Sequence, residues 1–142
     1  MQTENHAETK SVQLVLEFLN RVWGLPHNLA AIDELMTEDY VITSGGKVIK
    51  GREDFKNWVK EFQYLLTDAV TTNQEAFSNP NGDMVVSRWI CTGKNNGIFG
   101  LPPDSLPVSF TGIAIWKICD GKLAECWAER SAFELYQQLQ KK

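Results

Sequence analysis

Helical and strand patterns are segregated along this chain of 142 residues, and their order narrows the folds that it can adopt. Apolar residues recur at helical spacing in three early segments, at about 12–23, 29–36 and 55–62. Beyond residue 68 the pattern is typical of strands, in segments at about 69–78, 83–93, 107–119 and 122–130. Helices that precede a run of long antiparallel strands predict an α+β domain, in which the helices cover one face of a curved sheet.

Turn signals separate these segments. A small hairpin is predicted at 40–49 with its turn at 44–46, and the Asp-Gly pair at 120–121 is typical of a two-residue turn between strands. A short helix is predicted at 131–139. The longest irregular stretch, 94–106, contains two glycines and two prolines, and a loop of that length in a compact domain is more often functional than idle.

Composition excludes several classes of partner. The chain has 14 Lys and Arg against 18 Asp and Glu residues, so it offers no basic surface for a phosphate backbone. It contains no apolar run of the roughly 18–20 residues that a membrane span requires, and its first ten residues lack the apolar centre of a signal peptide. We therefore expect a polar tail at 1–10, a single domain at 11–142, and a soluble cytoplasmic protein with no nucleic-acid or membrane partner.

The cysteines and histidines predict neither a metal site nor a disulfide framework. The three cysteines, Cys91, Cys119 and Cys126, form an odd set without a Cys-x-x-Cys pair or nearby histidines. Of the two histidines, His6 lies in the predicted tail and His27 in a turn. We expect reduced thiols, no histidine-based catalysis, no metal and no cofactor.

Four strings resemble the SnoaL-like polyketide cyclase family of the nuclear-transport-factor-2-like superfamily. They are Gly-Ile-Phe-Gly-Leu-Pro-Pro at 97–103, Phe-Thr-Gly-Ile at 110–113, Asp-Gly-Lys-Leu-Ala-Glu-Cys-Trp at 120–127 and Gln-Gln-Leu at 137–139. The resemblance covers most of the chain. It implies a cone-shaped α+β barrel, in which a long, curved, mostly antiparallel sheet wraps around N-terminal helices and encloses an apolar pocket. It also implies a homodimer formed through the outer face of the sheet.

The catalytic residues of that family do not carry over to this sequence. In the family's cyclases an acid/base aspartate lies four residues after a Glu-His-Trp string, and here Ser131 stands four residues after Trp127. The histidine of that string is Cys126, and the histidines of two other family strings fall on Asn95 and Thr43. A serine has no proton to exchange near neutral pH, so the resemblance predicts the scaffold without its cyclase chemistry.

Strand geometry gives a prediction of the pocket wall. In a hairpin with a two-residue turn at 120–121, residues at equal distances before and after the turn face each other. This register pairs Trp116 with Glu125, Ala114 with Trp127, Gly112 with Glu129 and Phe110 with Ser131. Both faces of this hairpin are largely apolar. We choose the Trp127 face as the lining, because the family's aspartate shares the parity of Ser131, and a bulge between the strands would reverse the choice.

Glu129 is then the candidate catalytic acid/base. On this register it lies next to Trp127 and opposite Gly112, whose missing side chain leaves room for a carboxylate or a ligand. Aromatic walls would raise the pKa of such a carboxyl group by desolvation, into the range of a general acid or base. The alternative is a surface or interface glutamate paired with a basic residue, namely Arg88, Arg130 or Lys117.

Six residues are candidates for substrate binding: Tyr40, Trp89, Asn95, Trp116, Trp127 and Ser131. A tyrosine hydroxyl or a side-chain amide can orient a carbonyl group in an apolar cavity. Tyr40 is otherwise a core tyrosine, and Asn95 is otherwise a turn residue. Trp58 lies on a helical stripe between Phe55 and Phe62, so we expect it to pack in the core.

Three functions stay open on this evidence. The first is an enzyme of cyclase, isomerase or hydrolase type, which acts on a hydrophobic, carbonyl-bearing, polyketide-like molecule by acid/base proton transfer. The second is a noncatalytic binding or carrier protein for an apolar ligand, favoured by the loss of the family's aspartate. The third is an interaction module that binds a protein through its sheet. The fold alone does not choose among them.

Overall fold

The computed structural model describes residues 6–140 and contains four α-helices and six strands within them. The helices are α1 (His6–Trp23), α2 (Ala31–Leu35), α3 (Arg52–Leu65) and α4 (Ala132–Gln140). The strands are β1 (Met36–Ser44), β2 (Lys47–Lys50), β3 (Leu66–Ser78), β4 (Met84–Asn95), β5 (Pro107–Cys119) and β6 (Lys122–Arg130). One 3-10 turn, η1 (Ile98–Gly100), lies in the loop between β4 and β5.

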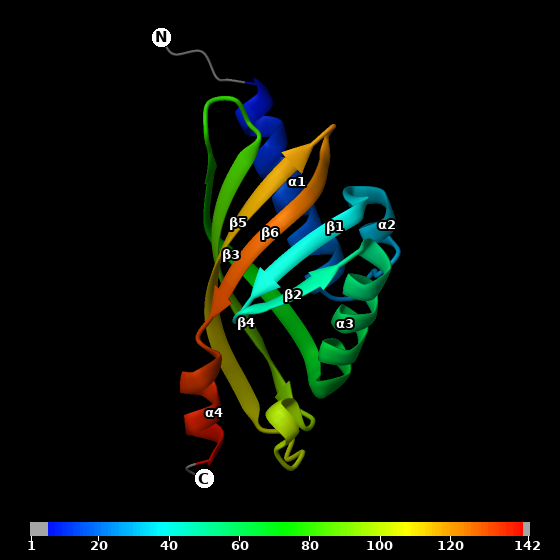
Figure 1. Ribbon diagram of the computed structural model, residues 1–142. Helices are drawn as coiled ribbons and strands as arrows, with labels where there is room; N and C mark the ends of the chain where they lie inside the picture. Colours follow the sequence, from blue (N-terminus) through cyan, green and yellow to red (C-terminus); the bar gives the residue numbers. More distant parts are fainter. Residues whose placement is uncertain (1–5, 141–142) are drawn as a thin grey trace.

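All six strands belong to one sheet, in the order β2-β1-β6-β5-β4-β3. Neighbouring strands are antiparallel except for β1 and β6, which run parallel. Figure 1 shows the sheet curving around α1 and α3, with α2 beside them, whereas α4 extends from the end of β6. The α+β cone predicted from the sequence is confirmed.

Two amphipathic helices fill the concave side of the sheet. α1 buries Val15, Phe18 and Val22 and packs against β3 and β4. α3 buries Phe55 and Val59 and packs against β1 and β3. Both helices bury the apolar stripes that predicted them, and the acidic residues in the first turn of α3 lie at the positive end of its dipole.

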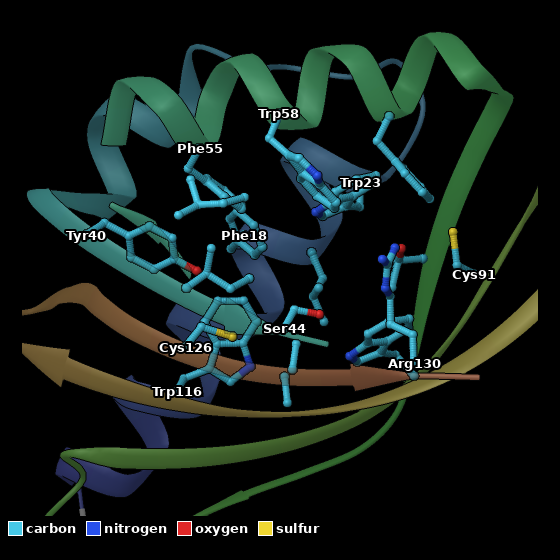
Figure 2. A pocket seen from close by; sticks show the side chains of 18 of the residues that line it. Phe18, Trp23, Tyr40, Ser44, Phe55, Trp58, Cys91, Trp116, Cys126 and Arg130 are labelled. Atoms are coloured by element: carbon cyan, nitrogen blue, oxygen red, sulfur yellow. The ribbon is translucent and has the colours of Figure 1, made fainter. Parts of the chain in front are cut away.

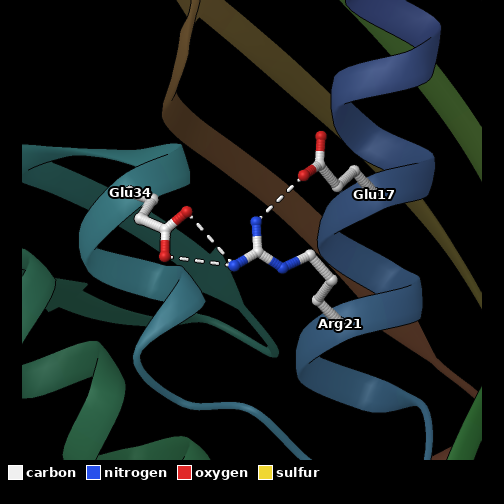
Figure 3. Close-up of polar contacts among 3 residues, drawn as sticks. All are labelled: Glu17, Arg21 and Glu34. Carbon is white, nitrogen blue, oxygen red and sulfur yellow. Dashed lines mark hydrogen bonds and ion pairs between the residues drawn. The ribbon is translucent and has the colours of Figure 1, made fainter.

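A surface network joins α1 to α2. Arg21 Nη1 donates to Glu17 Oε2 at 2.9 Å, and its Nη2 donates to both carboxylate oxygens of Glu34 at 3.1 Å (Figure 3). Surface pairs of this kind contribute little to stability. Their effect here is to orient the short helix α2, whose first residues have no side-chain cap.

Two element boundaries differ from the prediction. α1 begins at His6, so the second half of the predicted polar tail is helical, and residues 1–5 lie outside the described part of the chain. β1 begins at Met36, before the predicted hairpin, because Met36 pairs with Leu123 of β6. That partner is distant in sequence, so local periodicity does not reveal the pairing.

A β-bulge corrects the predicted register of β5 and β6. Asp120 and Gly121 both have positive φ, and the first pairs beyond them match a two-residue turn. The register then shifts by one residue, so that Lys117 faces Glu125 and Trp116 faces Cys126. Because side chains alternate along a strand, every residue of β6 beyond the shift points to the face opposite the one predicted from an unshifted register. The predicted lining face of β6 is therefore wrong.

Candidate ligand cavity

A cavity of about 380 Å³ lies between α1, α3 and the inner face of the sheet (Figure 2). Its wall is mainly aromatic, and the rings come from both helices and three strands: Phe18, Trp23, Tyr40, Phe55, Trp58, Phe62, Trp89, Phe110 and Trp116. This volume lies within the range of small-molecule sites, which are concave, mostly apolar and equipped with few polar groups. The arrangement is that of a site for a hydrophobic small molecule.

The aromatic residues of α3 form a continuous stack along the cavity. The Trp58 ring stacks on Phe62 with centroids 5.4 Å apart and on Phe55 at 6.3 Å. Phe62 in turn meets Phe110 of β5 edge to face at 6.2 Å. Trp58 packs against the core as expected, but it also faces the cavity, so the helical stripe has both roles.

Trp89 and Trp116 reach the cavity from neighbouring strands. Trp89 lies against Gly112, and a Cβ at Gly112 would overlap two carbons of the indole. The space beside Gly112 is thus filled by a ring and is not available to a carboxylate, contrary to the prediction. Trp116 donates from its indole Nε1 to the buried hydroxyl of Ser87 at 3.0 Å, which satisfies both polar groups.

Tyr40 and Cys126 form one polar end of the cavity. Both are buried, and the Tyr40 ring packs edge to face on Phe55 at 4.9 Å. The Tyr40 hydroxyl lies beside the Cys126 thiol and has no nitrogen or oxygen partner for a hydrogen bond among the described residues. Burial, together with the adjacent Cys126, raises the pKa of Tyr40 well above its ordinary value, and burial raises the pKa of Cys126 to about 12. Both groups are therefore neutral hydrogen-bond donors at neutral pH.

Arg130 and Cys91 form a second polar end. Figure 2 shows Arg130 pointing from β6 toward α3, and its guanidinium carbon lies 5.6 Å from the Trp58 ring centroid and 5.4 Å from that of Phe62. Burial lowers the pKa of Arg130 from its ordinary value, but an arginine in a protein stays protonated at physiological pH. Burial raises the pKa of Cys91 to about 11, so this thiol is uncharged.

The structure brings three of the predicted site residues to the cavity, namely Tyr40, Trp89 and Trp116. Trp127 and Glu129 lie on the opposite, outer face of the sheet, as the bulge requires, and both are exposed. Glu129 Oε1 accepts a hydrogen bond from the backbone N–H of Gly45 at 3.3 Å. The geometric basis for a catalytic Glu129 is thereby lost.

Asn95 and Ser131 have contacts within the protein and do not line the cavity. The Asn95 amide donates to the carbonyl of Pro102 and to Asp104, and its oxygen accepts from the backbone N–H groups of Gly97 and Ile98. Asn95 therefore holds together the loop between β4 and β5. Ser131 Oγ accepts from the backbone N–H of Thr111 at 3.0 Å and fixes the end of β6.

The sequence prediction missed Arg130, Cys91 and Cys126 as lining residues. Arg130 and Cys126 share the parity of Ala128 on β6, so the correct choice of face would have found both. Cys91 lies on β4 and shares the parity of Trp89, which the sequence predicts in the wall. No residue that lines the cavity is Asp, Glu or His. Residues 10–140, whose side chains are described, hold no cluster of three or more His, Cys, Asp or Glu that could bind a metal. No helix in the described residues is both long and apolar enough to span a membrane.

The cone, its single sheet and its aromatic cavity define the chain as a small-molecule pocket protein of α+β class. The family model described as SnoaL-like polyketide cyclase matches residues 13–139. The chain belongs to the SnoaL-like polyketide cyclase family. No curated protein matches this sequence.

Solved structures share the fold at low sequence identity. A candidate SnoaL-like polyketide cyclase from Jannaschia sp. CCS1 is 19% identical with a TM-score of 0.86, and 96% of each chain is covered. IdmH, a candidate polyketide cyclase from Streptomyces antibioticus, is 21% identical with a TM-score of 0.78, over 91% of this chain and 97% of its own. An LEH-like epoxide hydrolase of M. tuberculosis is 15% identical with a TM-score of 0.73, over 94% and 92%. The fold is thus shared by polyketide cyclases and an epoxide hydrolase.

Proposed function

We propose that this protein binds a hydrophobic, ring-bearing small molecule in the cavity and acts as a receptor or carrier for it. The observation that supports this function is the chemistry of the wall, which is largely aromatic and contains no carboxylate or imidazole. A proton transfer next to a carbonyl needs a base whose pKa is close to the working pH. None of the buried acids of the cavity, Tyr40, Cys91 and Cys126, has such a pKa.

Binding of a neutral fluorescent compound, N-phenyl-1-naphthylamine, tests the proposal. Its emission rises in an apolar site, and the tryptophans of the wall report its arrival by quenching. Ala114, which is buried on the inner face of β5, is replaced by phenylalanine to fill the cavity. The matched control is Glu129→Gln on the outer face.

We expect the wild-type protein and Glu129→Gln to bind the compound equally, and Ala114→Phe to bind it at least about tenfold more weakly. A tenfold loss corresponds to about 1.4 kcal/mol, which overlap with a single ring readily exceeds. Circular dichroism shows whether the filled variant is folded. The proposal fails if the wild type does not bind the compound, or if a folded Ala114→Phe binds it as well as the wild type.

A catalytic role is the second candidate, and the buried Tyr40 hydroxyl in the cavity wall is the observation that favours it. A buried donor in an apolar cavity polarises the carbonyl group of a bound ligand. Without a base in the cavity wall, such a group supports only reactions in which the ligand itself or water acts as the base. Incubation of the protein with a small-molecule extract of its source organism distinguishes the two functions. A binding protein enriches one compound unchanged, whereas an enzyme converts it in a manner that Tyr40→Phe slows.

We further propose that the outer face of the sheet forms a homodimer interface. One row of directly paired residues crosses all six strands there and is apolar except for a threonine: Phe77, Val86, Ile115, Trp127, Thr43 and Val48. Phe77 and Val48 are more than half exposed at its two ends. Apolar surface of this extent favours burial against a partner.

Light scattering with size-exclusion chromatography tests the dimer. We expect the wild type to have the mass of a dimer and Trp127→Glu that of a monomer, because a charge in the middle of the row opposes its burial. Thr92→Glu, on the same face of β4 but away from the row, is the matched control and stays dimeric. A wild type that is monomeric at high concentration contradicts this proposal.

A further inference from the structure

Arg130 differs from the other arginines of the chain in its surroundings. Arg21, Arg52 and Arg88 each pair with a carboxylate of the protein. Among residues 10–140, whose side chains are described, none forms a hydrogen bond or ion pair with the Arg130 guanidinium. It is the arginine that lines the cavity.

Three aromatic rings surround this guanidinium. Its central carbon lies 5.6 Å from the Trp58 ring centroid, 5.4 Å from that of Phe62 and 6.0 Å from that of Phe110. The face of an aromatic ring attracts a cation, but the ring offers no hydrogen-bond acceptor to the N–H groups, which lie in the plane of the guanidinium. The aromatic rings therefore hold the guanidinium in place and leave its N–H groups free to donate hydrogen bonds to a ligand.

The nearby protein groups do not neutralise this charge. Glu129, the preceding residue of β6, attracts this charge through space but makes no ion pair with it, because its carboxylate lies on the outer face and accepts a hydrogen bond from Gly45. Cys91 lines the same cavity, and burial keeps its thiol protonated at neutral pH. A desolvated cation without a counterion is unfavourable in the empty protein, and an anionic ligand group would relieve that cost.

We propose that Arg130 binds the carboxylate of a hydrophobic carboxylic acid, which is the ligand class of this cavity. The inference rests on the proposed function, since it names the chemistry of the molecule that the cavity takes. A guanidinium matches a carboxylate with two parallel hydrogen bonds, and a planar acid also fits between the flat rings of the wall. A phosphate monoester carries a second negative charge, and the three rings around Arg130 supply no further cation for it.

The separation between Arg130 and Tyr40 also sets the length of a ligand that would contact both residues. Cys126 beside Tyr40 and Arg130 lie four residues apart on β6, which separates their backbones by about 13 Å. Both side chains face the cavity. A ligand that spans it would place its carboxylate at Arg130 and a hydrogen-bond acceptor, such as a carbonyl oxygen, near the Tyr40 hydroxyl. Its ring system would lie against the aromatic stack of α3.

Calorimetric titration with two naphthalene compounds of nearly equal size tests the assignment. 2-Naphthoate carries the carboxylate and 2-naphthamide is its neutral counterpart. We expect the wild type to prefer 2-naphthoate by at least about tenfold, the size of a charge-assisted hydrogen-bond pair. Arg130→Met keeps the length of the side chain and should lose the preference, binding the two compounds with similar affinity. Arg88→Met removes an exposed arginine and should retain the wild-type preference.

The outcomes separate this inference from the proposed function. Equal binding of the two compounds by the wild type, or an undiminished preference in Arg130→Met, overturns the carboxylate site and leaves the cavity's binding role standing. Failure of the wild type to bind either compound or N-phenyl-1-naphthylamine overturns both. If Arg130→Met does not fold, Arg130→Lys keeps the charge without the planar fork. A preference reduced severalfold in Arg130→Lys supports the assignment, and an unchanged preference contradicts bidentate binding.

Discussion

Replacing Gly112 with alanine places a Cβ in space that the Trp89 indole occupies. The new atom would overlap two indole carbons and lie 2.8 Å from a third, Cε2. Ordinary contact between carbon atoms is about 3.5–4.0 Å, so the ring must move by more than about 1 Å. Trp89 is packed between the sheet and the cavity and meets Phe110 edge to face, so this shift disturbs the wall.

The expected cost follows from the packing of the site. Overpacking a well-filled core costs about 1–3 kcal/mol, and replacing a strand glycine with alanine returns roughly 0.5 kcal/mol or more of backbone entropy. We therefore expect Gly112→Ala to lower the free energy of unfolding by about 1–2 kcal/mol. The melting temperature of a chain of this size then falls by about 3–8 °C.

A double-mutant cycle isolates the contact from other effects of the substitution. Phenylalanine at position 89 lacks the indole atoms that the new Cβ would overlap, so Gly112→Ala should cost less than about 0.5 kcal/mol in the Trp89→Phe background. Chemical denaturation followed by circular dichroism, at one protein concentration, gives all four free energies. Equal costs in the two backgrounds, or no cost in either, would refute the inward packing of Trp89 on Gly112.

Two further predictions concern the thiols and the loop. Burial raises the pKa of Cys91 to about 11 and that of Cys126 to about 12, above the ordinary value of 9.0. As the pH rises above about 9 the unfolded chain loses these protons first, so the free energy of unfolding falls between pH 9 and 11. Denaturation at pH 7 and pH 10 should show a smaller fall in the double variant Cys91→Ala, Cys126→Ala, and an equal fall would contradict burial of the thiols. Asn95→Ala leaves the N–H groups of Gly97 and Ile98 without their acceptor, so it should cost about 2–4 kcal/mol of stability. Its affinity for N-phenyl-1-naphthylamine should stay within about twofold of the wild type, whereas a large loss of binding by a folded variant would return Asn95 to the site.

The architecture could be predicted because its signals are local. The spacing of Phe55 and Val59 predicts the buried face of α3, and the bounds of β5 and β6 match the prediction at 107–119 and 122–130. These strands end where the Asp-Gly turn at 120–121 imposes positive φ. The start of β1 at Met36 was missed because it depends on a parallel partner far along the chain.

The site could be predicted only in part, because one bulge decides which face of β6 lines the cavity. The register skips Ala124, a residue type with no particular preference for a bulge, so the sequence contains no marker of the shift. Trp116 lies on β5, where simple alternation holds, and it faces the cavity. Tyr40 also faces the cavity, although the register of β1 with β6 shifts between Met36 and Val41. Trp127 and Glu129 lie beyond the bulge, and their predicted orientation is reversed.

The five tryptophans allow the occupied face to be identified in solution. Trp23, Trp58, Trp89 and Trp116 line the cavity, whereas Trp127 lies on the outer face. A titration with N-phenyl-1-naphthylamine, followed through the indole N–H signals in ¹H–¹⁵N spectra, reports on each ring separately. Binding in the cavity predicts that the signals of the four lining tryptophans move together while that of Trp127 stays in place. Movement of the Trp127 signal alone would contradict the cavity as the ligand site.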